Sequence, residues 1–251
     1  MIASKYLGRA TFVASFPVDR SIRYKVEDIE RSFQAVFTAQ AVSTNVPDTG
    51  PSSIPRFTMQ SGPKQISVSQ VTVQLDLNFE DQRKSISNTL TIIEKNFASF
   101  WAGVCQLKKV EEIKNAGMVL TINTPSQQTR EEICAKILER YAKVPRRGTP
   151  ASASIQFGFK DEAELLFNNV SVQHYEVRAG RVPNAPPGET SISIEISSLP
   201  MQEQGYEAKF DINSRPMEAA QVVSTINLGN VLMESVKAFT TGWGEEFFTW
   251  E

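Results

Sequence analysis

The stretch Val71-Thr72-Val73-Gln74-Leu75-Asp76-Leu77-Asn78-Phe79 decides the fold that the sequence predicts. Its apolar side chains occupy every second position with polar side chains between them, which indicates a β-strand with one buried face. After residues 80–85 the apolar spacing changes to three and four residues and continues to Val104, as in an amphipathic helix. The stretch therefore predicts a strand that leads directly into a long helix, and such a helix can lie across the sheet.

A similar arrangement occurs near the C-terminus. Ala208-Lys209-Phe210-Asp211-Ile212-Asn213 matches residues 73–78 in its apolar positions and in its Asp and Asn. Each stretch leads into a helical pattern that ends in aromatic residues and glycines. Gly229 interrupts the second helical pattern, and close packing against a neighbour would explain it. The repetition favours two related halves, although any two strand–helix units share some of this pattern.

The remaining elements follow from the same periodicities. We expect strands at residues 10–16, 118–123, 152–159, 165–177, 191–197 and 206–213, and helices at 25–38, 86–104, after Thr129 and after Pro216. Alternation over residues 33–39 leaves a strand possible there. Thr129 and Glu132 fit a capping box, Ser61-Gly62-Pro63 fits a hairpin turn, and residues 108–114 read as a solvated segment.

Proline, glycine and two arginines interrupt every period in residues 145–150. We therefore expect an N-terminal α+β half over 1–144, a linker over 145–150 and a C-terminal half of four strands and a helix over 151–251. The predicted fold class is α+β, with each half forming a mainly antiparallel sheet with a long amphipathic helix.

Composition limits the classes of function. The chain has 251 residues and a formal net charge of −2, which gives no general attraction to nucleic acid. It has no apolar run of the roughly 20 residues that a membrane helix needs, and its N-terminus does not resemble a secretion signal. We expect a cytoplasmic protein without membrane association. Cys105 and Cys134 lack metal-type spacing and are expected to be reduced thiols.

Few residues suggest catalysis or a cofactor. The chain has one histidine, His174, which we expect to be a half-exposed strand residue; a single histidine excludes histidine-rich metal sites. The sequence contains no phosphate-binding glycine loop, nucleophile elbow, zinc helix or calcium loop. We therefore predict no metal and no cofactor, and the sequence favours binding over catalysis.

The sharpest enzymatic alternative is Glu207-Ala208-Lys209. A Glu-x-Lys triplet on a strand is the core of one large nuclease class, in which the carboxylate and an upstream acidic residue hold Mg²⁺ and the lysine positions water. Asp161 or Glu195 could supply the second carboxylate. The competing interpretation is that Glu207 and Lys209 lie on a solvated face of the strand.

Two other groups of residues are candidates for contact with partners. Arg146 and Arg147 could contact phosphate, or they could be linker charges near the C-terminus of a helix. The final nine residues contain Trp243, Phe247, Phe248 and Trp250. Four aromatic side chains at a terminus are predicted either to fold over the core or to form an interface with another subunit.

The order of elements carries a resemblance. A strand near 10–16, a helix with Phe33-Gln34, the hairpin at 61–64, the helix 86–104 and Val119-Leu120-Thr121-Ile122-Asn123 are similar to a sporadically distributed, uncharacterised bacterial family of two-half α+β proteins. Phe210-Asp211-Ile212 and Phe239 extend the resemblance to the C-terminal half. This chain lacks the histidine that the last helix of such proteins often carries. The topology is also similar to that of SecB-type chaperones. The resemblance implies a fold and no catalytic residues.

Together these observations predict a non-catalytic protein-binding or assembly component that self-associates through a sheet edge, a long helix or the aromatic tail. One alternative is a metal-dependent nuclease or other nucleic-acid-acting protein that uses Glu207 and Lys209. A second is a small-ligand-binding module with its site between the halves.

Overall fold

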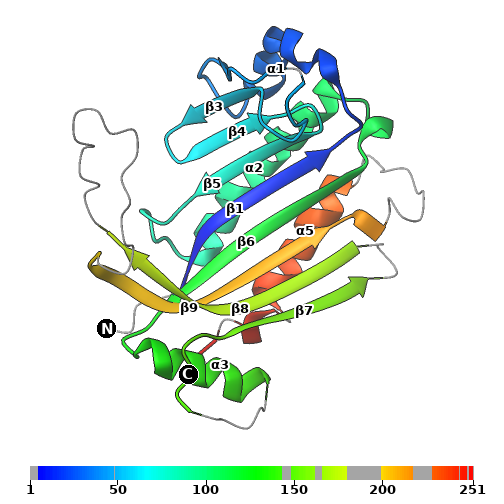
Figure 1. The fold of residues 1–251 in the computed structure, drawn as a ribbon. Coiled ribbons are helices and arrows are strands. Elements are labelled where there is room, and N and C mark those ends of the chain that lie inside the picture. The colour runs from blue at the N-terminus through cyan, green and yellow to red at the C-terminus, as the bar shows by residue number, and fades with distance from the viewer. Residues whose placement is uncertain are drawn as a thin grey trace, which may run out of the picture.

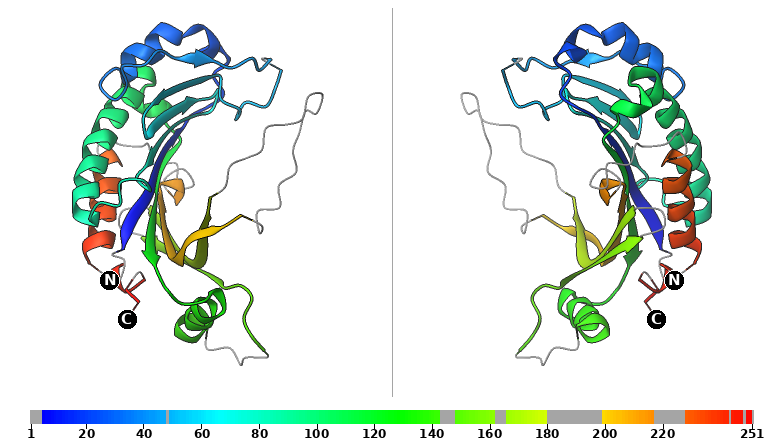
Figure 2. Two further views of the ribbon diagram at one scale, coloured as in Figure 1. Left: turned by 90° about the vertical axis from the view of Figure 1, so that its left-hand side faces the viewer. Right: turned by 90° about the vertical axis from the view of Figure 1, so that its right-hand side faces the viewer.

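The computed structural model describes residues 5–47, 49–142, 148–161, 166–179, 199–216, 228–242, 244–247 and 249–250. Within these residues the chain forms one nine-stranded antiparallel sheet, with two long helices packed against one face (Figure 1). Seen from the side, the sheet is curved and these helices lie on its convex face (Figure 2). The predicted combination of helices with a mainly antiparallel sheet is confirmed.

The strands differ greatly in length. In chain order they are β1 (Tyr6–Ser15), β2 (Val42–Ser43), β3 (Phe57–Ser61), β4 (Lys64–Val68), β5 (Thr72–Asn78), β6 (Asn115–Pro125), β7 (Ser154–Asp161), β8 (Leu166–Arg178) and β9 (Met201–Asn213). Across the sheet their order is β2-β3-β4-β5-β1-β6-β9-β8-β7. Strands β1 and β6 therefore lie side by side near the middle, and β2 and β7 form the two edges.

The described helices are α1 (Val26–Phe33), α2 (Ile86–Leu107), α3 (Arg130–Tyr141) and α5 (Leu228–Thr241), with short 3₁₀ helices η1 (Arg20–Tyr24), η2 (Val110–Glu112) and η4 (Glu245–Phe247). Helices α2 and α5 are the pair on the convex face, and α3 lies at the end of the sheet near the C-terminus (Figures 1 and 2). No helix in the described part of the chain is long and apolar enough to cross a bilayer.

The alternating stretch behaves as its pattern predicts. In β5 the side chains of Val73, Leu75 and Leu77 are buried, and the polar residues between them face the other way. Leu75 lies opposite Phe12 of β1 in the antiparallel register. One face of β5 therefore belongs to the core, because side chains alternate between the two faces of a strand.

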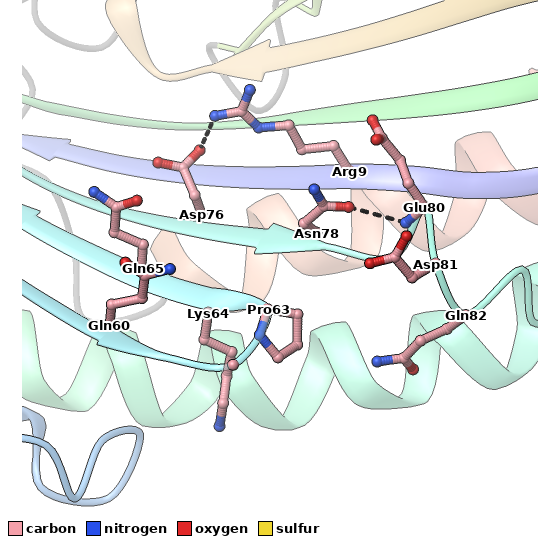
Figure 3. A pocket seen from close by; sticks show the side chains of 11 residues that line it. Arg9, Gln60, Pro63, Lys64, Gln65, Asp76, Asn78, Glu80, Asp81 and Gln82 are labelled. Carbon is pink, nitrogen blue, oxygen red and sulfur yellow. Dashed lines mark hydrogen bonds and ion pairs between the residues drawn. The ribbon is translucent and has the colours of Figure 1, made fainter. Parts of the chain in front are cut away.

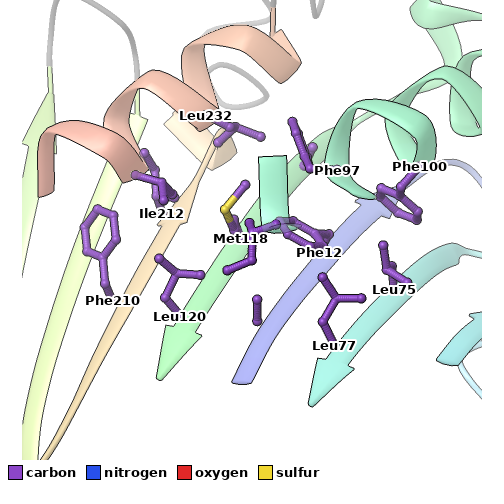
Figure 4. Packing of buried hydrophobic residues seen from close by; sticks show 14 of the residues in the cluster. Phe12, Leu75, Leu77, Phe97, Phe100, Met118, Leu120, Phe210, Ile212 and Leu232 are labelled. Atoms are coloured by element: carbon purple, nitrogen blue, oxygen red, sulfur yellow. The ribbon is translucent and has the colours of Figure 1, made fainter. Parts of the chain in front are cut away.

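Aromatic and aliphatic side chains fill the layer between the sheet and the two long helices (Figure 4). The ring of Phe12 on β1 is 5.0 Å from that of Phe97 and 6.2 Å from that of Phe100, both on α2. On the other side, Phe210 of β9 stacks on Phe239 of α5 with 3.9 Å between ring centroids. Each long helix is thus anchored to a central strand by burial of large apolar surface.

Two helix glycines allow close packing. A Cβ atom added at Gly103 of α2 would lie 2.5 Å from the carbonyl oxygen of Ser32, so α1 and α2 approach closely there. A Cβ at Gly229 of α5 would lie 2.8 Å from the indole ring of Trp101. The predicted close packing at Gly229 is confirmed, and it offsets the low helix propensity of glycine.

Local sequence signals mark several boundaries correctly. The predicted capping box is present at the start of α3: Thr129 N–H donates to the Glu132 carboxylate at 2.8 Å, and Glu132 N–H donates to Thr129 Oγ1 at 3.3 Å. Gly62 has a φ of 55° in the turn between β3 and β4. A positive φ favours glycine, so the predicted hairpin is confirmed at a position where glycine is required.

Other boundaries differ from the prediction. The helix expected at 25–38 ends at Phe33, because the N–H groups of Val36 and Phe37 both donate to the Phe33 carbonyl and close the helix in a turn. The alternative strand over 33–39 is therefore wrong. Strand β9 begins at Met201 rather than at residue 206, since residues 201–205 pair with β8 without an apolar alternation. The strand expected at 191–197 lies outside the described residues.

Lys108 corrects the expectation of a solvated segment at 108–114. Its side chain is 7% exposed, its ammonium group forms an ion pair with the Asp19 carboxylate, and it lies 4.5 Å above the ring of Phe16. Lys25 Nζ and the backbone N–H of Ser21 also donate to Asp19, each at 2.9 Å. Burial raises the pKa of Asp19, but the hydrogen bonds from Lys108, Ser21 and Lys25 together outweigh burial and hold that pKa far below its usual range.

Replacement of Asp19 by asparagine is expected to lower the free energy of unfolding at pH 7 by about 2 kcal/mol, because charge-assisted hydrogen bonds are lost and Lys108 remains buried. The folded-state pKa is lowered, so the stabilisation is present above the unfolded-state pKa of about 4 and is lost as the pH falls below it. Urea unfolding of wild type and Asp19→Asn between pH 7 and pH 2 measures this. A difference that stays constant over that range would contradict the assignment.

Candidate functional site

The face of the sheet opposite α2 and α5, here called the open face, is mainly polar, with Val13 and Val119 among its polar side chains. Its central polar side chains alternate along the strands with the core residues; they are Arg9, Thr11, Asp76, Thr121, Asn123, Ser171, Gln173, Glu207, Lys209 and Asp211. Strand register sorts their charges into rows that run across the sheet. Arg9 and Lys209 share a row on either side of Thr121, and the neighbouring rows contain only carboxylates as charged groups. Opposite charges therefore alternate over the open face.

Glu207 and Lys209 both lie on this face, as the period of the strand predicts. Lys209 Nζ is 3.0 Å from a Glu207 oxygen, and Gln173 Nε2 donates to the same oxygen at 2.6 Å. The cross-strand neighbours of Glu207 are Asn123 and Gln173, which are uncharged. The structure therefore gives Glu207 an ion pair and an amide as partners.

The second carboxylate of the nuclease alternative is not brought to Glu207. Asp161 lies opposite the buried Leu166, and its side chain therefore points to the helix side of the sheet. Glu195 lies outside the described residues. Within the described ranges, no three His, Cys, Asp or Glu side chains are grouped so that they could hold a metal ion. The nuclease alternative therefore stays a prediction, and the described residues do not supply the second Mg²⁺ ligand that it needs beside Glu207.

A recess of about 640 Å³ lies at one corner of the open face (Figure 3). It is lined by Arg9, Gln60, Gly62, Pro63, Lys64, Gln65, Asp76, Asn78, Glu80, Asp81 and Gln82. Its charged centre is internally matched: Arg9 Nη2 is 2.6 Å from an oxygen of Asp76, which also accepts hydrogen bonds from Thr11 and Gln74, each at 2.7 Å. Burial raises the pKa of Asp76, and the donors Thr11, Arg9 and Gln74 together lower it below its usual value.

A buried polar cluster lies near this recess, next to the turn that leads into α2. The Glu203 side chain is 8% exposed, and one of its oxygens accepts hydrogen bonds from the hydroxyls of Tyr6 and Tyr175, each at 2.8 Å. The other oxygen is 2.6 Å from Arg83 Nη1. Arg83 has a φ of 41° and its guanidinium lies 5.4 Å from the centre of the Tyr6 ring. Asn123 Nδ2 donates to the Tyr6 hydroxyl at 3.4 Å.

In this Glu203 cluster, consisting of Tyr6, Arg83, Asn123, Tyr175 and Glu203, the pKa of both tyrosine hydroxyls is raised. Burial raises the pKa of each hydroxyl, and the neighbouring Glu203 carboxylate raises it further because it accepts the proton in a hydrogen bond. The cluster connects β1, β6, β8 and β9 to the turn before α2. Its members are far apart in the sequence, and the sequence carries no motif that identifies them.

The aromatic tail is partly described, and the described part packs on this chain. The ring of Phe247 is 6.2 Å from that of Tyr141 and 5.8 Å from that of Phe157. Trp250 stacks on Tyr206 with 4.0 Å between centroids and lies 5.0 Å below the guanidinium of Arg140. Arg140 also donates to the carbonyls of two tail residues, at 2.5 and 2.6 Å. Phe247 and Trp250 therefore complete the core around α3. Of the two predicted outcomes, folding over the core and forming an interface, these two residues show the first.

The remaining predicted residues are placed as follows. Trp243, Phe248, Arg146 and Arg147 lie outside the described residues, so their predicted contacts with a partner or phosphate stay predictions. His174 does not fit the expected half-exposed position: its side chain is 9% exposed and its Nε2 is 3.4 Å from Gln204. Most of its side chain is covered because it lies opposite Tyr206 on the helix side of the sheet, where α3 packs.

Comparison with known proteins identifies no relative: no family model, curated protein or solved structure matches the chain.

Proposed function

We propose that this chain is a non-catalytic protein-binding or assembly component, and that it binds a partner by adding a strand to the β7 edge of its sheet. The observation that carries the proposal is the position and composition of β7. It ends the strand order, it is eight residues long, and its strand partner among the described residues is β8. An edge strand exposes backbone donors and acceptors on its outer side, and such an edge is a template for another strand.

The side chains of β7 also suit strand addition. Ile155, Phe157 and Phe159 alternate along one face, the strand contains no proline, and its two charged residues stand together at its end. Phe159 is 44% exposed although it is aromatic. Proteins commonly protect a sheet edge with proline, central lysines or a bulge. The middle of β7 carries none of these features.

The opposite edge of the sheet is protected in one of the usual ways. Strand β2 has only two residues, and it pairs with β3 through Val42 and Ser43. Thr44 N–H continues the contact by donating to the Arg56 carbonyl at 2.9 Å. A very short edge strand offers little backbone to a partner. The two edges of the sheet therefore differ, and β7 is the one suited to pairing.

We also infer that the chain consists of two related halves. This relation makes the difference between the β2 edge and the β7 edge clearer. Both halves follow the order strand, helix, three strands, long helix: β1-α1-β3-β4-β5-α2 and β6-α3-β7-β8-β9-α5, with β2 as an addition to the first. Their strands run outward from the central β1–β6 pair in the same order. The equivalent residues Asp76 and Asp211 lie in one row of the open face. In this scheme β7 corresponds to β3, whose outer edge is covered by β2.

A photo-crosslinking amino acid placed at Gln156 of β7 tests the proposed function in the cells from which the sequence derives. The matched control places it at Lys95, an exposed residue of α2 on the convex face. Light-dependent crosslinks to protein, from Gln156 and not from Lys95, are expected. No crosslink from Gln156, or equal crosslinking from both positions, would overturn the proposal that β7 is the binding edge.

A further inference from the structure

We infer that the partner at the β7 edge is a second copy of this chain, paired antiparallel to the first about a two-fold axis that lies midway between the two copies of Phe157. This inference rests on the proposed function and adds the identity of the partner and the register. It follows from the pattern of side chains on the two faces of β7.

The two faces of β7 limit the possible registers. Its partner β8 places Ile155 opposite the buried Val172 and Phe157 opposite the buried Val170, so these residues face the helix side. Ser154, Gln156 and Gly158 face the open side. In an antiparallel pair, residues directly opposite each other point to the same side of the sheet. In a symmetric pair one residue must therefore lie directly opposite its own copy across the two-fold axis, since a register shifted by one residue would place apolar side chains opposite polar ones.

Among these registers, the one centred on Phe157 pairs all three large apolar residues of β7 with one another, and Ala153, which precedes the strand, lies opposite Asp161. It places Phe157 opposite Phe157 of the second copy, and Ile155 opposite Phe159. A centre at Gly158 would place Ile155 opposite Asp161, and a centre at Gln156 would place Phe159 opposite the small Ala153. Aromatic and β-branched pairs directly opposite each other stabilise antiparallel strands.

The charges agree with the same register. On the open side it places Lys160 opposite Ser154 and Gln156 opposite Gly158, so no like charges meet. A glycine at position 158 leaves room for the ring of Phe167 on the same chain, because a Cβ atom at Gly158 would lie 2.9 Å from that ring. Pairing in this register covers the exposed Phe159 and joins the open faces of two copies into one continuous polar surface.

Disulfide crosslinking tests the register. In the proposed pair, residue 154 of one copy lies opposite residue 160 of the other, at a separation that a disulfide can span. Two copies of residue 154 would be roughly 20 Å apart, six residues along the strand. A mixture of Ser154→Cys and Lys160→Cys chains should form a disulfide-linked dimer under mild oxidation, and each variant alone should not. Wild type controls for Cys105 and Cys134.

Light scattering over a range of concentrations tests the partner itself. Wild-type protein should show twice the mass of the 27.9 kDa chain. Phe159→Lys should raise the dissociation constant at least about tenfold, because it places a charge opposite an apolar residue at the pairing edge. Tyr24→Lys, at a residue of η1 that is 79% exposed and lies outside the sheet, should leave the mass unchanged.

The outcomes separate this inference from the proposed function. A wild-type monomer, an unlinked mixture, or links within single-variant samples would overturn the self-pairing inference. If Gln156 still crosslinks to a different protein in cells, the proposed function stands and only the second copy is wrong. If Gln156 forms no crosslinks in cells, the proposed function fails, whether or not the purified protein dimerises.

Discussion

Replacement of Phe100 by alanine is expected to lower the free energy of unfolding by about 3–5 kcal/mol. Phe100 is 1% exposed, and its ring lies 6.2 Å from that of Phe12 on β1 and 6.0 Å from that of Phe33 on α1. It is the side chain through which α2 contacts both the central strand and the first helix. Its truncation removes apolar surface from the core and leaves a cavity that three elements must close.

Urea unfolding followed by circular dichroism measures the Phe100→Ala effect. Phe100→Leu, which keeps most of the apolar volume, should lose clearly less stability than the alanine variant. Thr91→Ala on the exposed side of the same helix should change stability by less than about 0.5 kcal/mol. A loss below about 1 kcal/mol for Phe100→Ala would show that the three elements repack readily, in conflict with this description of the core.

Replacement of Glu203 by alanine is expected to cost about 3 kcal/mol, because two tyrosine hydroxyls lose their acceptor inside the protein. Each buried donor left without a partner costs roughly 1–3 kcal/mol. The ion pair with Arg83 adds little to this figure, since the Arg83 side chain is 55% exposed and regains water. The larger loss comes from the hydroxyls of Tyr6 and Tyr175, which are held between three strands.

A double-mutant cycle separates these contributions. Glu203→Gln retains an acceptor oxygen and should lose less stability than Glu203→Ala. Tyr175→Phe should cost about 1 kcal/mol in the wild type and much less in the Glu203→Ala background, where its partner is already absent. Additive losses from Glu203→Ala and Tyr175→Phe would mean that the hydroxyl and the carboxylate do not stabilise each other.

The Glu203 cluster and the β7 edge bear differently on function. The Glu203 carboxylate is fully paired, since both of its oxygens have partners, and the cluster connects four strands. It therefore helps to maintain the shape of the sheet. The β7 edge lies at the far side of the strand order, where pairing among the described strands ends. We expect stability changes from the first and association changes from the second, which makes the two sets of variants useful controls for each other.

The candidate surface was predictable in part. The period of two over residues 206–213 is sufficient to place Glu207 and Lys209 on one face, and the structure agrees. The position of a second carboxylate depends on which strands become neighbours, and Asp161 proved to point to the other side. The sequence raised a sheet edge as one possible interface. Only the strand order identifies β7 as that edge.

By itself, the sequence determined the local features: the alternation of β5, the amphipathic stripe of α2, the hairpin at Gly62 and the capping box of α3. These depend on neighbours a few residues apart, whose geometry is set by the period of a strand or helix. Only the tertiary structure decided that Lys108 is buried against Asp19, or that Tyr6 meets Glu203. Such contacts join residues far apart in the chain, and they depend on strand order and register, which the burial of the whole core selects.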